Sequence, residues 1–311
     1  MKVVRRHTAA WMLGAAAIAV VPAACVRSET PDVAEPQRST ARMSLTFTRI
    51  GSGEGLRFEG QGHFVRFAAS DADHVPAILG LPDDESIPLD TCRAIDSAEA
   101  LDRALAAARS TLPVKLLDAG RLQVKGPHDS TALAPRHYPE LTPYVAGVVY
   151  GNEDTLPVAL EPGAVYEVAA EGGEDIGPFA AQVNAPREFP TLEVPVFRRG
   201  GELELKWREA GETSGPLVLS VSWSARGSAR EVRCRVRDDG SFSVGRELLA
   251  ALPPPTQLMS AEVAALRTRT APVATPGIGR GELRVGLRDV LPLPVAAWPA
   301  NVAAPPAPED R

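Results

Sequence analysis

The fold class is decided by one stretch, Val232-Arg233-Cys234-Arg235-Val236-Arg237-Asp238-Asp239-Gly240-Ser241-Phe242-Ser243-Val244. Apolar and polar residues alternate on both sides of its Asp-Asp-Gly centre, which is the period of a half-buried β-strand. Asp-Gly between two such runs predicts a β-hairpin, because both residues tolerate the positive φ angles of a tight turn. This part of the chain therefore predicts antiparallel β structure.

The same alternation recurs on both sides of this stretch. Apolar side chains alternate with polar ones in the run 203–207, and apolar residues recur at every second position in 217–223 and 283–287. Residues 263–268 are expected to form a further strand. About six strands in about 100 residues are typical of an immunoglobulin-like sandwich. Residues 196–292 are therefore expected to form one such domain that folds on its own, with Trp207, Trp223 and Cys234 in its core.

The first half of the chain has shorter strands, separated by Gly and Pro. The expected strands are 45–49, 63–67, 122–124, 144–150, 165–168 and 179–183, which predict a first β-sandwich over 43–186. One helix is expected near 96–109, because Asp96 and Glu99 form a capping box before apolar residues at helical spacing. The proline-rich stretch 186–195 marks a domain boundary. The predicted fold class is all-β, with two immunoglobulin-like β-sandwich domains and one short helical insertion in the first.

The N-terminus has the pattern of a bacterial export signal. A basic start is followed by apolar residues 9–21 and then by Cys25. So short an apolar run cannot cross a hydrocarbon core of about 30 Å, so residues 1–24 are expected to be a signal peptide for Sec export. Cys25 is the predicted lipidation site, which would anchor the protein to the cell envelope, at the outer membrane. Pro22 stands where the lipoprotein motif normally has an aliphatic residue, so ordinary cleavage near Ala24 is the alternative.

The two ends of the mature chain lack apolar periodicity. Residues 25–42 are expected to form a disordered tether, and residues 299–311 a flexible tail. Removing Lys2, Arg5 and Arg6 from the 33 basic residues leaves 30 against 39 acidic ones, a net charge of −9. This net acidity argues against nucleic acid as a partner, because its phosphates require a basic surface. Membrane attachment would therefore come from the N-terminal lipid.

Two cysteines remain after Cys25. Cys92 and Cys234 are an even pair in an oxidising compartment, where a disulfide is allowed. The alternative is two separate buried thiols, because unpaired cysteine packs as a small hydrophobic residue. The sequence leaves both possibilities open.

Motifs for catalysis are weak, and no catalytic residue, metal site or cofactor is predicted. The serine in Gly51-Ser52-Gly53-Glu54-Gly55 stands second rather than third, so the segment is not a nucleophile elbow. Mature histidines occur only in the first half of the chain, at His63, His74, His128 and His137. Acidic residues between Asp71 and Glu85 offer oxygen ligands for calcium, but they match no EF-hand spacing.

All four tyrosines fall within a short part of the first half, at Tyr138, Tyr144, Tyr150 and Tyr166. Tyrosine is an efficient binding residue because its ring is large and stiff and its tip is polar. These residues are a candidate binding surface. The alternative is that they hold a sheet together as cross-strand pairs.

Several segments resemble predicted lipoproteins of the myxobacterial type. They are Leu116-Leu117-Asp118-Ala119-Gly120, Val145-Ala146-Gly147-Val148-Val149-Tyr150, Glu161-Pro162-Gly163, Leu205-Lys206-Trp207 and Val232-Arg233-Cys234-Arg235-Val236. The resemblance covers most of residues 43–290. It implies two β-rich domains and export to the envelope, and it implies no activity, since that family has none established.

The expected function is that of a non-catalytic exported envelope lipoprotein. It would present β-sandwich surfaces to an envelope protein or a polysaccharide. One alternative is a secreted hydrolase with a dispersed active site. Another is a binding module stabilised by calcium in the 71–85 region.

Overall fold

The computed structural model describes residues 36–51, 55–96, 102, 105–106, 114–142, 145–152, 158–210, 215–225 and 228–296, without the side chains of 138–142 and 228. All of these residues belong to one compact unit that begins at Pro36.

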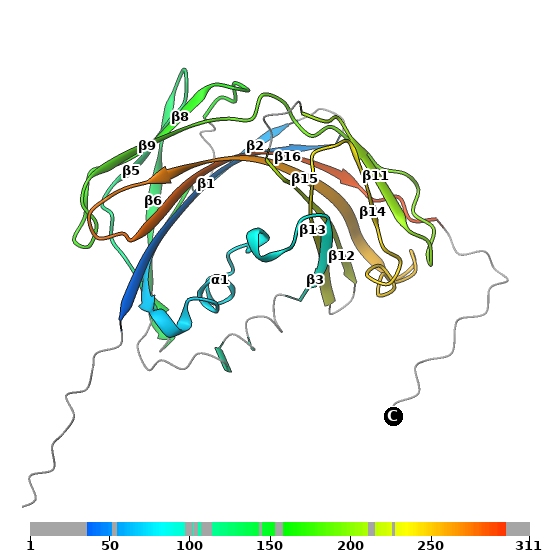
Figure 1. Cartoon of the computed structure of the whole chain (residues 1–311), viewed down its shortest axis with the longest axis horizontal. Helices are drawn as coiled ribbons and strands as arrows, with labels where there is room; N and C mark the ends of the chain where they lie inside the picture. The colour runs from blue at the N-terminus through cyan, green and yellow to red at the C-terminus, as the bar shows by residue number, and fades with distance from the viewer. Residues whose placement is uncertain are drawn as a thin grey trace, which may run out of the picture. The chain divides into compact units, whose positions relative to one another are not determined.

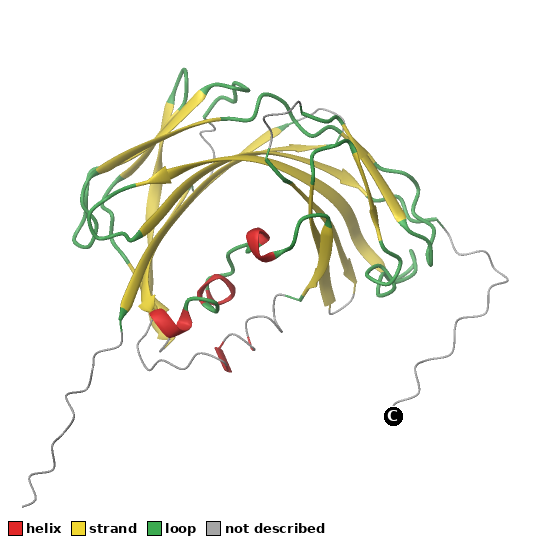
Figure 2. Ribbon diagram, viewed as in Figure 1, coloured by secondary structure: helices red, strands yellow, loops and turns green. Residues whose placement is uncertain are grey.

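The described residues form 16 strands, one short α-helix and two 3-10 helices (Figure 2). The helices are η1 (Ala69–Asp71), α1 (Val75–Ile78) and η2 (Asp84–Ser86). The strands of the first half are β1 (Gln37–Ile50), β2 (Leu56–Ala68), β3 (Thr91–Ile95), β4 (Val114–Leu116), β5 (Leu122–Lys125), β6 (Ser130–Thr142), β7 (Val145–Gly151), β8 (Val165–Ala170) and β9 (Phe179–Asn184). Those of the second half are β10 (Leu192–Glu193), β11 (Leu203–Trp207), β12 (Leu217–Ala225), β13 (Ser228–Val236), β14 (Ser241–Val244), β15 (Leu258–Val273) and β16 (Arg280–Pro292).

Thirteen of these strands form one mixed sheet, in the order β3-β13-β12-β15-β16-β1-β2-β4-β7-β6-β5-β8-β9. β1 joins the two halves of the chain, because it pairs in parallel with β16 on one side and antiparallel with β2 on the other. Figure 1 shows this sheet curved, with β5, β8 and β9 on its outer side at one end. The small sheet β10-β11-β14 lies on the outer side at the other end (Figure 1).

The first hydrophobic core lies between the curved sheet and the strands β5, β8 and β9. Successive side chains on a strand point to opposite faces, so Met43, Leu45 and Phe47 of β1 all enter this core, each with 0% exposure. Phe47 packs against Phe58 and Tyr166, with ring centroids 5.1 and 5.3 Å apart. The late strand β16 adds further core residues, Leu283, Val285 and Leu287. The first core therefore needs residues from the end of the chain.

The second core lies between the large sheet and the small sheet. Trp207, Trp223 and Cys234 are buried in it, which confirms their predicted place in a core. One ion pair is also buried here: Arg267 of β15 donates from Nε to Asp238 at 2.7 Å. The Trp207 indole N–H donates to the same carboxylate at 2.8 Å.

The prediction of an all-β fold is confirmed. The finer prediction of two separate immunoglobulin-like sandwiches is not confirmed, because strands from both sides of 186–195 hydrogen-bond in one sheet. This continuity arises at two places, β1 with β16 and β3 with β13. The described residues instead form two large cores on the same side of one sheet and a smaller cluster around Val75 on the inner side.

The hairpin predicted at Asp238-Asp239-Gly240 is wrong. β13 pairs with β12 and β3, whereas β14 pairs with β11 in the small sheet. The turn carries the chain from one layer to the other. Gly240 has φ +95°, and its carbonyl accepts a hydrogen bond from the Trp207 N–H at 3.0 Å. The Asp-Gly pattern located a turn correctly, but buried side chains on both layers determined which strands pair.

Two further boundaries differ from the sequence prediction. The predicted tether includes Gln37–Arg42, yet these residues belong to β1, where β2 pairs with all six and β16 pairs from Thr40 onward. Within the helix predicted near 96–109, the structure describes helical backbone at Asp102, Leu105 and Ala106. The rest of that helix, residues 25–35 of the tether and the predicted tail at 299–311 lie outside the described residues.

Candidate functional site

The inner face of the curved sheet is polar. Along each strand, the residues that alternate with the core residues point to this face. On β16 they are Glu282, Arg284, Gly286 and Arg288, and on β13 they are Glu231, Arg233 and Arg235. Figure 1 shows α1 on the same inner side, where Val75 packs against Val65 and Phe67 of β2.

These polar residues surround a hollow of about 510 Å³. Strands β13, β12, β15, β16, β1 and β2 all contribute to its lining. The hydroxyl side chains in the lining are Ser44, Thr46, Ser220, Thr268 and Thr270. The arginines are Arg42, Arg233, Arg235, Arg284 and Arg288, and the acidic residues are Glu59, Asp84, Glu85 and Glu231. The hollow therefore offers many hydrogen-bond donors and both signs of charge.

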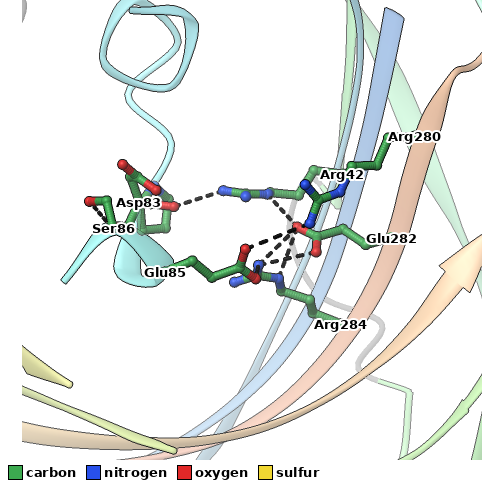
Figure 3. A network of polar contacts seen from close by, with 8 residues as sticks. Arg42, Asp83, Glu85, Ser86, Arg280, Glu282 and Arg284 are labelled. Carbon is green, nitrogen blue, oxygen red and sulfur yellow. Dashed lines mark hydrogen bonds and ion pairs between the residues drawn. The ribbon is translucent and has the colours of Figure 1, made fainter. Parts of the chain in front are cut away.

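One side of the hollow is closed by a segment that we call the strap, residues 82–90. Arg42 donates from Nη1 to the Pro82 carbonyl at 2.7 Å, and Arg284 donates from Nη2 to Glu85 at 2.6 Å. In Figure 3, Arg42 and Arg284 reach from the sheet toward the strap, with Glu282 between them. Arg233 donates from Nη1 to Asp84 at 3.1 Å. These three arginines bind the strap from three different strands.

Glu282 connects two of these arginines. Its carboxylate accepts hydrogen bonds from Nε of Arg42 at 2.7 Å and from Nε of Arg284 at 3.0 Å. Burial raises the pKa of Glu282, but the adjacent guanidinium groups of Arg284 and Arg42 outweigh it and hold that pKa below its ordinary value. Glu282 is therefore ionised at neutral pH and holds both arginines in place.

The far end of the strap leads into β3, which a disulfide joins to β13. Asp90, with φ +59°, receives hydrogen bonds on its carboxylate from the Arg237 backbone N–H and from Arg237 Nε. Two residues later, Cys92 forms a disulfide with Cys234, its direct register partner on β13. The pairing that the sequence left open is thus present in the structure. It ties the edge strand β3 to the second core.

His63 of β2 also lines the hollow. Burial, together with the nearby charge of Arg42, lowers the pKa of His63. Its ring is therefore neutral at neutral pH. In the part of the chain that the structure describes, no hydrogen bond joins His63 to a serine or a carboxylate.

The tyrosine surface predicted from the sequence is wrong for two of its four members. Tyr150 and Tyr166 are 2% and 0% exposed and belong to the first core. The Tyr150 hydroxyl donates to Asp118 at 2.9 Å and accepts from the Ala119 N–H, which explains how this polar tip is buried. Burial raises the pKa of both phenols. Tyr144 and the Tyr138 side chain lie outside the described residues, as does Cys25.

The acidic residues that the sequence proposed for calcium have other partners. Asp84 and Glu85 accept hydrogen bonds from arginines of the hollow, and Asp71 is buried in η1. Among the described residues, no group of three His, Cys, Asp or Glu side chains is placed to hold a metal ion. The calcium alternative therefore gains no ligand set from these residues.

The hollow was not identified from the sequence. Its residues alternate with core residues, and a solvated sheet face has the same pattern.

No protein-family model and no curated protein matches the chain. Within the described ranges, none of the helices is both long and apolar enough to span a bilayer. The resemblance to myxobacterial lipoproteins stays a prediction.

Proposed function

We propose that this chain is a non-catalytic binding protein of the bacterial cell envelope, anchored through an acylated Cys25. Its ligand is an acidic polysaccharide, a short stretch of which enters the hollow. The sequence supports the anchor through its export signal and the cysteine that follows. The ligand class is supported by the lining of the hollow.

The observation that carries this proposal is the combination of five guanidinium groups and five hydroxyl side chains, against four carboxylates, on one concave surface. Polyhydroxylated acids need many donors and acceptors together with compensating positive charge. Protein partners are bound mainly through hot spots of Trp, Tyr and Arg, and the described lining of the hollow contains no Trp or Tyr. Tyr150 and Tyr166 are buried, so they are not available for that role. A polysaccharide is therefore the better fit of the two partner classes.

The size and form of the hollow agree with a short saccharide segment. Its volume of about 510 Å³ lies in the usual range of small-ligand sites, roughly 300–1,000 Å³. The strap is held by partly buried ion pairs, so it gives the hollow a fixed wall. A wall fixed before binding reduces the entropy lost when a ligand is ordered.

The test is calorimetric titration of the mature protein with trigalacturonate, and with neutral maltotriose as the uncharged comparison. Trigalacturonate is expected to bind and maltotriose to bind much more weakly. Thr270→Trp should abolish binding, because Thr270 is exposed and lines the hollow. Ser241→Trp, at an exposed position of the small sheet outside the hollow, is the matched control. No binding of trigalacturonate, or equal loss in both variants, would contradict the proposal.

The anchor has its own test. When the protein is expressed in its host, the wild type should sediment with membranes, and Cys25→Ala should move to the soluble fraction. Mass spectrometry of the mature N-terminus should find diacylglyceryl on Cys25. An unmodified Cys25 in a membrane-bound wild type would show that the anchor lies elsewhere.

A further inference from the structure

Arg288 differs from the other arginines of the hollow. Arg42, Arg233 and Arg284 each form an ion pair with a carboxylate, and Arg235 donates to the Ile87 carbonyl at 3.4 Å. In the described part of the chain, the Arg288 side chain has neither a hydrogen-bond nor an ion-pair partner. It is only partly exposed. A guanidinium group at such a site carries a positive charge that a ligand can neutralise.

The residues next to Arg288 on β16 form part of the floor of the hollow. Arg284, Gly286 and Arg288 stand at every second position, so they point to the same face, with about 7 Å between successive residues. Gly286 has no side chain, and a Cβ atom there would lie only 2.8 Å from Cδ1 of Leu266, so the Leu266 side chain lies close over the glycine. Gly286 and Leu266 together form the floor of the hollow between the two arginines.

The strands on both sides supply hydroxyl groups at the same level. The register partner of Gly286 is Thr46 on β1 and Thr268 on β15. Neighbouring strands are about 4.8 Å apart, and both threonines line the hollow. Two arginines along β16 and two threonines across it thus surround one space. Arg284 contributes charge while it remains paired with Glu85 and Glu282.

One carboxylate limits what this space accepts. Glu59 of β2 is the register partner of Thr46 and lines the same hollow. It accepts a hydrogen bond from Gln61 Nε2. Glu59 disfavours a second anionic group on the β2 side, and it can accept hydrogen bonds from ligand hydroxyls there. The charge pattern therefore orients a ligand with its acidic group over β16.

We propose that Gly286, flanked by Arg284, Arg288, Thr46 and Thr268, forms a subsite for one oxyanion, a sulfate, phosphate or carboxylate group. Arg288 is the main recognition residue, because its planar fork of N–H donors matches two oxygens of such a group. The assignment of this oxyanion to an acidic saccharide rests on the proposed function. Binding of a free oxyanion does not depend on it.

The experiment titrates the mature protein with sodium sulfate, inorganic phosphate and galacturonate, at constant ionic strength, and follows backbone amide shifts by NMR. At least one of the three is expected to bind with shifts centred on β16 and β1. Arg288→Ala should weaken that binding by about tenfold or more, and Arg288→Lys by less, since it keeps the charge and loses the fork.

Arg246→Ala is the matched control. Arg246 is exposed and lies outside the hollow, and its side chain has no hydrogen-bond or ion-pair partner among the described residues. It should leave oxyanion binding unchanged. Since the Arg288 side chain likewise lacks such a partner, Arg288→Ala should keep the melting temperature of the wild type, which separates lost binding from lost folding.

The outcomes distinguish this subsite from the proposed function. If none of the three anions binds, or if Arg288→Ala binds them as the wild type does, the subsite is overturned even when trigalacturonate binds elsewhere in the hollow. If sulfate or phosphate binds through Arg288 but trigalacturonate does not bind, the subsite stands and the saccharide assignment fails.

Discussion

Arg267 is a charged residue buried at a strand position where the neighbouring core residues predict an apolar side chain. It occupies a core-facing position of β15, between Ala265 and Arg269, and its side chain is 3% exposed. Its charge is compensated by Asp238, and its remaining donors reach the carbonyls of Glu188 and Arg208, both at 2.8 Å. The pair therefore links the large sheet to the turn between the two layers.

Arg267→Leu is expected to lower the free energy of unfolding by about 3–5 kcal/mol, because it leaves the Asp238 carboxylate buried without a counter-charge. Urea unfolding measures this change. Arg246→Ala, at an exposed arginine, should stay within about 0.5 kcal/mol of wild type. The double variant Arg267→Leu/Asp238→Asn should recover part of the loss. A single variant as stable as the wild type would show that the pair is not buried.

The pKa of Glu282 gives a pH dependence at the residue scale. Because its folded pKa lies below its ordinary value of 4.5, the unfolded state takes up a proton more readily than the folded state. Its contribution to stability is therefore complete above about pH 5 and falls as pH drops through 4.5 and below the folded pKa. Glu282→Gln should flatten the acid limb of a stability profile measured by urea unfolding between about pH 3 and 6. An unchanged profile would contradict this assignment.

At the scale of elements, most strands could be predicted because one face of each is buried in a core, which gives the sequence a period of two. The runs around Leu45 and Leu205 alternate strictly, and apolar residues recur at every second position around Leu219. Strands β1, β11 and β12 lie there. β6 was missed because Pro135 and Pro139 interrupt its pattern. β4 and β10 are too short for a period to appear.

The strap depends on both its ion pairs and its disulfide. The double variant Cys92→Ser/Cys234→Ser should destabilise the protein by about 2–4 kcal/mol, because the disulfide closes a long loop in the unfolded chain. Hydrogen exchange should increase in β3 and the strap, where Asp90 N–H donates to the Arg235 carbonyl. Reduction of the wild type should give the same result. Unchanged exchange would mean that the arginines alone hold the strap.

At the scale of the whole molecule, the contacts that determine the fold join residues far apart in the sequence, and local sequence patterns do not reveal them. β1 and β16 pair over long sequence separation, with Thr40 opposite Arg280 and Ile50 opposite Val290. Local patterns reveal which residues turn inward, but they do not reveal which strand lies next in the sheet. The hollow depends on this pairing, because Thr46 and Gly286 meet only through it. The fold class was therefore predictable, and the candidate site was not.

Because both halves of the chain share one sheet, fragment 196–292 is not expected to fold alone, contrary to the prediction from the sequence pattern. Alternation alone predicts an independent domain. The structure places Leu283, Val285 and Leu287 of this fragment in the first core, and it pairs β16 with β1 and β13 with β3. The isolated fragment would expose these three side chains and two unpaired strand edges. It is expected to lack a cooperative urea transition, whereas 36–296 should unfold in one. A fragment 196–292 that unfolds cooperatively would show that the second core is sufficient by itself.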